Sequence, residues 1–142
     1  MGYGLENKNG SFRFNLFAWS YVLTMAIHHG WEPKGTKLNE NDWDGNYLLN
    51  CAQMVEKEDA KNLAKALRSS MIDVPDIRID YIFKTIIDRY DLRETITNHF
   101  DKKLEYDKEE FVKGLAYFSG PEGKKYLHEF IEFCEVGRFS IF

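Results

Sequence analysis

The stretch Gly30-Trp-Glu-Pro-Lys-Gly-Thr36, followed by a polar run and then Trp43-Asp-Gly-Asn-Tyr-Leu-Leu-Asn50, divides this chain of 142 residues. An apolar helical pattern leads into it, and further helical patterns follow it. The stretch holds two of the three tryptophans, with glycines and a proline, in an irregular segment. We expect a loop of this kind to be ordered, either packed on the core as a structural lid or kept for contact with a partner.

The residues before the loop predict a short strand and a central helix. Ser11–Asn15 alternate between apolar and polar residues, and Asn15 is suited to cap a helix. Over Leu16–His29, apolar residues recur at three- and four-residue spacing, and others fill the opposite side, so this helix should be covered on most sides. Gly30 is expected to end it in a left-handed conformation. Residues 1–10 are rich in Gly and Asn and are expected to be loose.

The residues after the loop predict further helices. Each predicted helix has an apolar stripe on one face, and two capping boxes and a proline mark helix starts. A strand over Ile77–Ile82 is an alternative, because β-branched residues are frequent there. The expected helices are Trp43 or Asn46 to Glu56, Asp59 to Met71, Ile79 to Tyr90, Leu92 to Leu104, Asp107 to Phe118, and Pro121 until Gly137.

These patterns predict a mainly α fold. We expect a single compact domain over residues 1–142, with six or seven helices, because the sequence has no internal repeat and no linker. Arg138–Phe142 alternate like a strand, so backbone pairing is predicted between Phe12–Phe14 and Phe139–Ile141. A chain of this length buries roughly 68–70% of the surface that its unfolded form exposes, enough for a core without metal or disulfide.

Composition argues against several partners and compartments. The net charge is −4 and Lys/Arg residues do not cluster, which argues against nucleic acid. Apolar runs stay short of the ~20 residues of a membrane span, and the first residues lack the form of a signal peptide, so we expect a cytoplasmic protein without a membrane partner. Cys51 and Cys134 both fall on apolar helix faces and are expected to be buried, reduced thiols. The oligomeric state stays open.

Motifs for catalysis, metal or cofactors are not evident. Adjacent helical histidines such as His28 and His29 point roughly 100° apart, so they are not expected to share a metal; one should face solvent and the other bond near the helix end. Asn39 to Asp44 resemble a calcium loop, but the Gly and Glu such a loop needs are replaced by Asp44 and Asn50. Nucleophile elbows and phosphate loops do not occur. We therefore expect no cofactor and no metal.

The polar and aromatic residues of the dividing stretch are the candidate binding surface. In one interpretation the tryptophans pin the loop to the core and the Asn side chains satisfy its backbone. In the other, aromatic anchors inside a polar rim form a contact surface, with at least one tryptophan ring partly exposed. The candidate residues are Trp31, Thr36, Trp43, Asn46, Tyr47 and Asn50.

Several phrases resemble a family of small bacterial proteins of unknown function. They are Phe12-Arg-Phe-Asn15 with Trp19, Gly30 to Thr36, Trp43-Asp-Gly-Asn-Tyr47 with Asn50, Asp59 to Leu67, Tyr126 to Cys134, and Gly137 to Ile141. The resemblance covers most of the chain, although Asp73–Glu105 carry none of it. It implies a bacterial, intracellular, single-domain protein and brings no catalytic residues with it.

Size, acidity and the aromatic loop favour a non-enzymatic protein-binding module, of the kind that caps a partner as immunity proteins and antitoxins do. The alternative is a small enzyme or ligand-binding domain that uses the Gly30–Asn50 loop as a pocket wall. A deep pocket with converging polar groups would favour the alternative, and an exposed apolar patch would favour the binding module.

Overall fold

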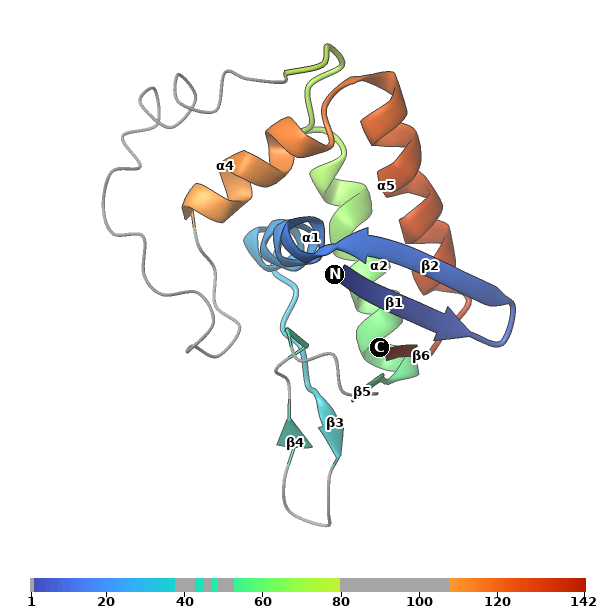
Figure 1. Ribbon diagram of the computed structural model, residues 1–142. Helices are drawn as coiled ribbons and strands as arrows, with labels where there is room; N and C mark the ends of the chain where they lie inside the picture. The colour runs from blue at the N-terminus through green and yellow to red at the C-terminus, as the bar shows by residue number, and fades with distance from the viewer. Residues whose placement is uncertain (1, 38–42, 45–46, 49–52, 80–107) are drawn as a thin grey trace.

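A computed structural model describes residues 2–37, 43–44, 47–48, 53–79 and 108–142 of the chain (Figure 1). These residues form both helices and short strands. In order, the elements are β1 (Gly2–Asn7), β2 (Gly10–Asn15), α1 (Leu16–His28), β3 (Thr36–Lys37), β4 (Trp43–Asp44), β5 (Gln53–Val55), α2 (Lys57–Ser70), α4 (Lys108–Tyr117), α5 (Gly120–Glu135) and β6 (Phe139–Ile141).

The two ends of the chain meet in a four-stranded antiparallel sheet of order β2-β1-β6-β5. Leu5 lies opposite Ile141, and Gly4 and Phe142 exchange two backbone hydrogen bonds of 3.0 and 2.7 Å. Alternate residues of each strand face inward, and Tyr3, Leu5 and Ile141 among them are buried. The sheet therefore has one face on the core, as period-two side-chain alternation requires.

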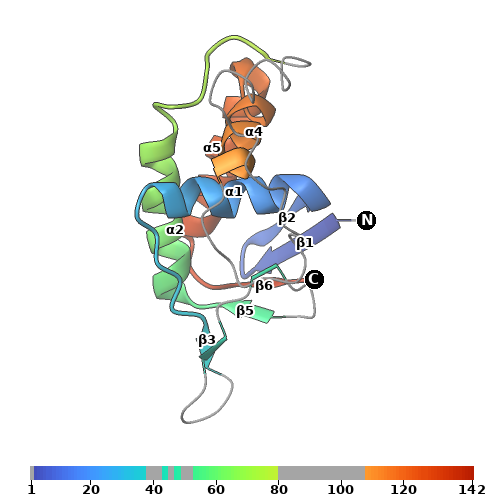
Figure 2. The ribbon, with the colours of Figure 1, turned by 90° about the vertical axis from the view of Figure 1, so that its left-hand side faces the viewer.

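Helix α1 runs through the middle of the molecule, and Figure 2 shows it crossing α2, with α4 on one side of it and the sheet on the other. The Asn15 side chain caps it by accepting the N–H groups of Phe17 and Ala18 at 3.0 and 2.8 Å. Apolar residues on several sides of the helix are buried, as its sequence predicts. Gly30 follows the helix with φ at +89°, the left-handed conformation expected there.

Aromatic side chains join α5 to the sheet and to α1. The Phe14 ring lies 4.7 Å from that of Phe130 and 5.9 Å from that of Trp19. Phe139 of β6 stands edge-on to Phe130 at 6.4 Å, and all four residues are buried. This cluster, with α2 packed along α5, forms the centre of the core.

The prediction of a mainly α fold with six or seven helices is wrong. The described residues form four α-helices and a four-stranded antiparallel sheet, so the fold is α+β. The helix expected from Trp43 or Asn46 to Glu56 is replaced by strands at Trp43–Asp44 and Gln53–Val55. The helices expected over Ile79–Tyr90 and Leu92–Leu104 fall on residues that lie almost wholly outside the described part of the chain.

The predicted strand pairing is wrong in its partner. Phe12–Phe14 pair with β1, and β1 lies between them and Phe139–Ile141. Residues 1–10 are not loose where they are described, because Gly2–Asn7 form β1. A Cβ added at Gly2 would stand 2.4 Å from the Phe14 carbonyl oxygen, so glycine permits this close strand approach.

The other helices begin and end near their predicted limits. Lys57–Ser70, Lys108–Tyr117 and Gly120–Glu135 correspond to the helices expected from Asp59, Asp107 and Pro121. Cys134 is buried and unpaired, and burial raises the pKa of its thiol, whereas Cys51 lies outside the described residues. Among the described helices, none combines the length and the apolar character needed to cross a membrane.

Candidate functional site

The loop that follows α1 is held by the carboxylate of Asp59, near the start of α2. Its Oδ1 accepts the backbone N–H of Lys34 at 2.9 Å, and its Oδ2 accepts that of Gly35 at 2.9 Å. The hydroxyl of Tyr47 donates to the same Oδ2 at 2.5 Å. Asp59 is only 2% exposed. Because three donors converge on one buried carboxylate, the course of the loop is fixed to the first turn of α2.

Three of the six candidate residues, Trp31, Thr36 and Tyr47, gather around this carboxylate. The indole N–H of Trp31 donates to the carbonyl oxygen of Asp59 at 3.2 Å, and its ring lies 6.1 Å from the nearly parallel ring of Tyr47. The Thr36 hydroxyl donates to the carbonyl oxygen of Met54. Trp31 and Tyr47 are buried, and Thr36 is half-buried. These three side chains therefore attach the loop to the core, which favours the structural-lid interpretation for this part of the loop.

The remaining candidates are not placed by the structure. Asn46, Asn50 and the side chain of Trp43 lie outside the described residues. The expectation that one tryptophan ring of the loop is partly exposed is not met by Trp31, which is 4% exposed, and it stays a prediction for Trp43.

Tyr47 is the most strongly perturbed titratable group of this cluster. Burial, reinforced by its hydrogen bond to Asp59, raises the pKa of Tyr47 far above its ordinary value. Its backbone carbonyl also accepts the indole N–H of Trp19 at 2.7 Å, inside the core. A tyrosine held in this way keeps its proton at neutral pH and has no acid–base role there.

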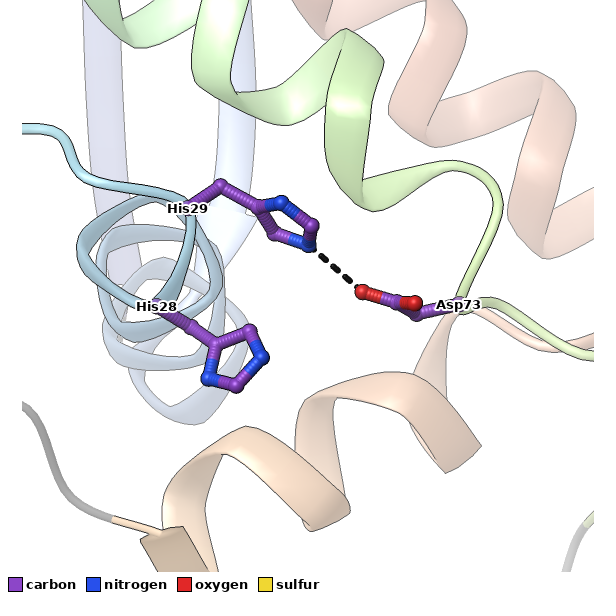
Figure 3. A group of neighbouring side chains, drawn as sticks. All are labelled: His28, His29 and Asp73. Atoms are coloured by element: carbon purple, nitrogen blue, oxygen red, sulfur yellow. Dashed lines mark hydrogen bonds and ion pairs between the residues drawn. The ribbon is translucent and has the colours of Figure 1, made fainter.

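A second group of side chains lies at the other end of the same loop. Figure 3 shows His28 and His29, from the end of α1, on the same side as Asp73 from the turn after α2. His29 Nε2 lies 2.5 Å from Asp73 Oδ2, a hydrogen bond between residues 44 positions apart. One donor atom from each of the three residues lies within 4.8 Å of the other two. Two imidazoles and a carboxylate are a ligand set that divalent transition metals use.

The expectation that the two histidine rings diverge does not hold. It assumed that both residues are helical, but α1 ends at His28, and His29 has φ −95° and ψ 21°. The His29 ring is consequently turned back beside that of His28, with ring centroids 5.1 Å apart. His29 does bond near the helix end, as predicted, and its partner there is a side chain from another element.

Helix α4 orients the second imidazole. The His28 ring stacks on Phe111, with centroids 3.9 Å apart and planes 21° from parallel. Partial burial, with a smaller contribution from His29, lowers the pKa of His28, while Asp73 acts in the opposite direction. The lowered pKa favours the neutral ring, the form that can donate a lone pair.

A shallow hollow of about 400 Å³ adjoins His29. The loop after α1 forms one wall and α2 forms the other. Its polar groups include two lysine side chains and a glutamate, and it is open to solvent. The lining residues are His29, Gly30, Trp31, Glu32, Lys34, Asn62, Lys65, Ala66 and Ser69.

Residues 71–79, which we call the α2 turn, carry the two most exposed large apolar side chains of the described residues. Ile72 is 89% exposed and Ile77 is 80% exposed. Val74 between them is buried and anchors the turn. Isoleucine loses favourable burial at such positions, so two of them in one short turn form an unusual apolar feature for a water-facing surface.

The backbone of the α2 turn is nonetheless held in place. The Asp73 N–H donates to Ser70 O at 2.9 Å, and Pro75 O accepts the N–H of Gly120 at 2.9 Å. The Ile79 N–H donates to the Ser119 hydroxyl at 2.8 Å. Bonds to α2 on one side and to the start of α5 on the other therefore position the exposed isoleucines on a fixed backbone.

Comparison of the chain with protein-family models, with curated proteins and with solved structures finds no match. The function must therefore be argued from the arrangement of its own residues. Sequence reasoning missed Asp59 as the anchor of the loop and Asp73 as the partner of the histidines. It assigned Asp59 only to a helix start, and the partners of the two aspartates lie 12 to 44 positions away in the sequence.

Proposed function

We propose that this chain is a non-enzymatic protein-binding module and that the α2 turn is its contact surface. The observation that carries the proposal is the exposure of Ile72 and Ile77, at 89% and 80%, on a backbone bonded to two helices. An apolar side chain on a backbone that is already ordered before binding loses little conformational freedom when a partner binds, which favours association. Among the described residues, every buried side-chain nitrogen and oxygen has a hydrogen-bond partner, so none is left in the core to await a ligand.

The charge of the chain suggests the kind of partner. Its net charge of −4 favours association with a basic protein, because opposite charges steer encounter and select the partner. Asp73 and Asp76 lie beside the two isoleucines in the sequence and are at least partly exposed, Asp73 bonded to His29 and Asp76 paired with Lys124. An acidic module that caps a basic partner through an apolar anchor is how an immunity protein or an antitoxin would act, and this is the form of the proposal we favour.

The test compares capture by the wild-type chain with capture by Ile72→Ser/Ile77→Ser and by Phe17→Ser. Phe17 is the matched control, because it is also exposed and apolar but lies at the start of α1. We expect a partner from the source cell to be retained by wild type and Phe17→Ser and lost by the double variant. The thermal midpoints should stay close together, because exposed substitutions rarely change stability by more than about 0.5 kcal/mol.

Three outcomes would contradict this assignment. They are retention of the partner by the double variant, equal loss of the partner in Phe17→Ser, and failure of the wild-type chain to retain any partner. A photo-reactive amino acid at position 72 gives a second readout, since it should cross-link to the captured partner directly.

A small-ligand or enzymatic role is the second candidate, and the hollow beside His29 is the observation that favours it. Gly30, Trp31, Glu32 and Lys34 of the loop line one side of this hollow, as the pocket-wall hypothesis requires. A thermal-shift screen of metabolite-sized compounds tests it, with Ser69→Trp as the variant that fills the hollow. Compounds that raise the melting temperature of wild type but not of Ser69→Trp would support this function over protein binding.

A further inference from the structure

We propose that His28, His29 and Asp73 form a binding site for a divalent transition-metal ion of the zinc type. The site rests on a different observation from the proposed protein contact, namely the convergence of two imidazoles and a carboxylate from two separate elements. One donor atom of each residue lies within 4.8 Å of the other two. Each of the three residues is at least partly exposed, so an ion can reach the site from solvent.

The distances bracket those of a tetrahedral zinc site. Ligand atoms that each lie about 2.0–2.1 Å from Zn²⁺ stand roughly 3.3 Å apart. His29 Nε2 and Asp73 Oδ2 are closer than this, at 2.5 Å, while the largest separation in the group stays within 4.8 Å. Entry of the ion requires the close pair to separate by roughly 0.8 Å and any wider pair to approach by at most roughly 1.5 Å. Side-chain rotation at exposed positions can supply such movements without a change in the backbone.

Metal entry has a defined proton balance. In the empty site one proton lies between His29 Nε2 and Asp73 Oδ2. The ion takes the place of that proton: the proton leaves Nε2 to solvent and solvent returns one to Nδ1, so the imidazole stays neutral and no net proton is released. Asp73 changes from a hydrogen-bond acceptor to a ligand through the same oxygen. Three protein ligands leave a fourth tetrahedral position for water, which is the arrangement of an open zinc site.

The surroundings of the site limit how the ligands can move. His28 is stacked on Phe111 of α4, which sets the plane of its ring. The Asp73 backbone N–H is bonded to Ser70 O at the end of α2. A bound ion would therefore join the end of α1 to the end of α2. Because the ion binds the folded arrangement, its binding should raise the melting temperature of the chain.

Titration of the untagged full chain with Zn²⁺, followed by calorimetry, tests the site. We expect one ion per chain in wild type. The variants are His28→Phe, which keeps a ring against Phe111, His29→Gln and Asp73→Asn. Each should weaken Zn²⁺ binding by at least the roughly 10–100-fold that loss of an outer-shell partner costs. Titration with Co²⁺ adds a visible absorption spectrum that reports nitrogen and oxygen ligands in a four-coordinate site.

Two control variants match the ligand variants in chemistry and also change exposed side chains. His128→Gln removes an exposed histidine that lies 3.3 Å from Glu132, and Asp76→Asn removes an exposed carboxylate three positions from Asp73. Both should bind Zn²⁺ as wild type does. The proposal is overturned if wild type takes up no Zn²⁺ at submillimolar concentration, if all three ligand variants keep wild-type affinity, or if the controls lose as much affinity as the ligand variants. Circular dichroism of every variant confirms that affinities are compared between folded chains.

Discussion

Substitution of Asp59 by alanine should cost this protein a large part of its stability. The change removes the acceptor of three donors, the backbone N–H groups of Lys34 and Gly35 and the hydroxyl of Tyr47. The donor of Lys34 is part-buried and can turn to water, but those of Gly35 and Tyr47 are buried. A buried donor left without a partner costs about 1–3 kcal/mol, and hydrogen bonds to a charged group are worth about 1.5–3 kcal/mol each.

Two orphaned buried donors and the lost hold on the loop together predict a decrease of about 3–5 kcal/mol in the free energy of unfolding. A domain of this size has about 5–15 kcal/mol in all. Urea unfolding followed by circular dichroism measures the difference. Tyr47→Phe removes one of the three donors and leaves the carboxylate its two backbone partners, so it should cost about 1–2 kcal/mol.

Glu58→Ala is the matched control for Asp59→Ala. Glu58 is the preceding residue in the same first turn of α2, but its carboxylate is 62% exposed and pairs with the equally exposed ammonium of Lys34 at 2.7 Å. Water screens such a pair, so this variant should unfold close to the wild-type urea midpoint. If the two alanine variants unfold at the same midpoint, the buried carboxylate does not hold the loop, and the account of the lid given above is wrong.

Three further changes test other parts of the fold. Deleting residues 138–142 removes β6, the strand between β1 and β5, together with the buried side chains of Phe139 and Ile141. The loss of each such side chain costs about 2–5 kcal/mol of stability, so the chain should lose cooperative unfolding. An unchanged melting temperature would contradict this. Cys134 should be labelled by a thiol reagent only when denaturant unfolds the chain, as mass spectrometry of its peptide can show, because burial raises its pKa and blocks access. Burial raises the pKa of Tyr21 from 10.0 to about 12, so between these pH values Tyr21 loses its proton in the unfolded chain and keeps it in the folded chain. The contribution of Tyr21 to stability should be full below pH 10 and fall by roughly 1.4 kcal/mol per pH unit above it. Tyr21→Phe should remove this part of the fall and leave the part that comes from Tyr47, whose pKa is also raised.

The long helices were predictable because each carries several turns of one pattern. Helix α1 buries the apolar residues that its spacing selects, and Asn15 and Gly30 mark its two ends as expected. Phe12–Phe14 and Phe139–Ile141 were predicted as strands, but β1 and β5 were not, so the sheet was expected with two strands rather than four. Gln53–Val55 have only three residues, too few to define a period of two. In β1 the inward residues Tyr3 and Leu5 alternate with glycines, and because glycine is depleted in strands, the local sequence predicts a loop there.

The sequence predicted which residues of the loop gather together, but not whether their side chains face the core or the solvent. The sequence grouped Trp31, Thr36 and Tyr47, and the structure brings these three together. The sequence could not show that they face inward, because the groups that hold them, on Asp59 and Met54, belong to other elements. Asp59 lies 24 or more positions from the backbone groups it binds, and a charged residue in the first turn of a helix is ordinarily solvated. A loop rich in tryptophan looks the same in sequence whether it covers a core or meets a partner.

The histidine pair shows how a correct spacing rule can mislead at the end of a helix. Histidines at adjacent positions diverge only while both residues keep helical dihedral angles, and Gly30 already predicted that the helix stops beside them. The residue at such a stop is free to turn its side chain back over the last turn, as His29 does with its ψ of 21°. The rule therefore applies inside a helix and not to a His-His-Gly ending. What no local pattern could supply is Asp73, which reaches His29 only because α2 returns the chain to the end of α1.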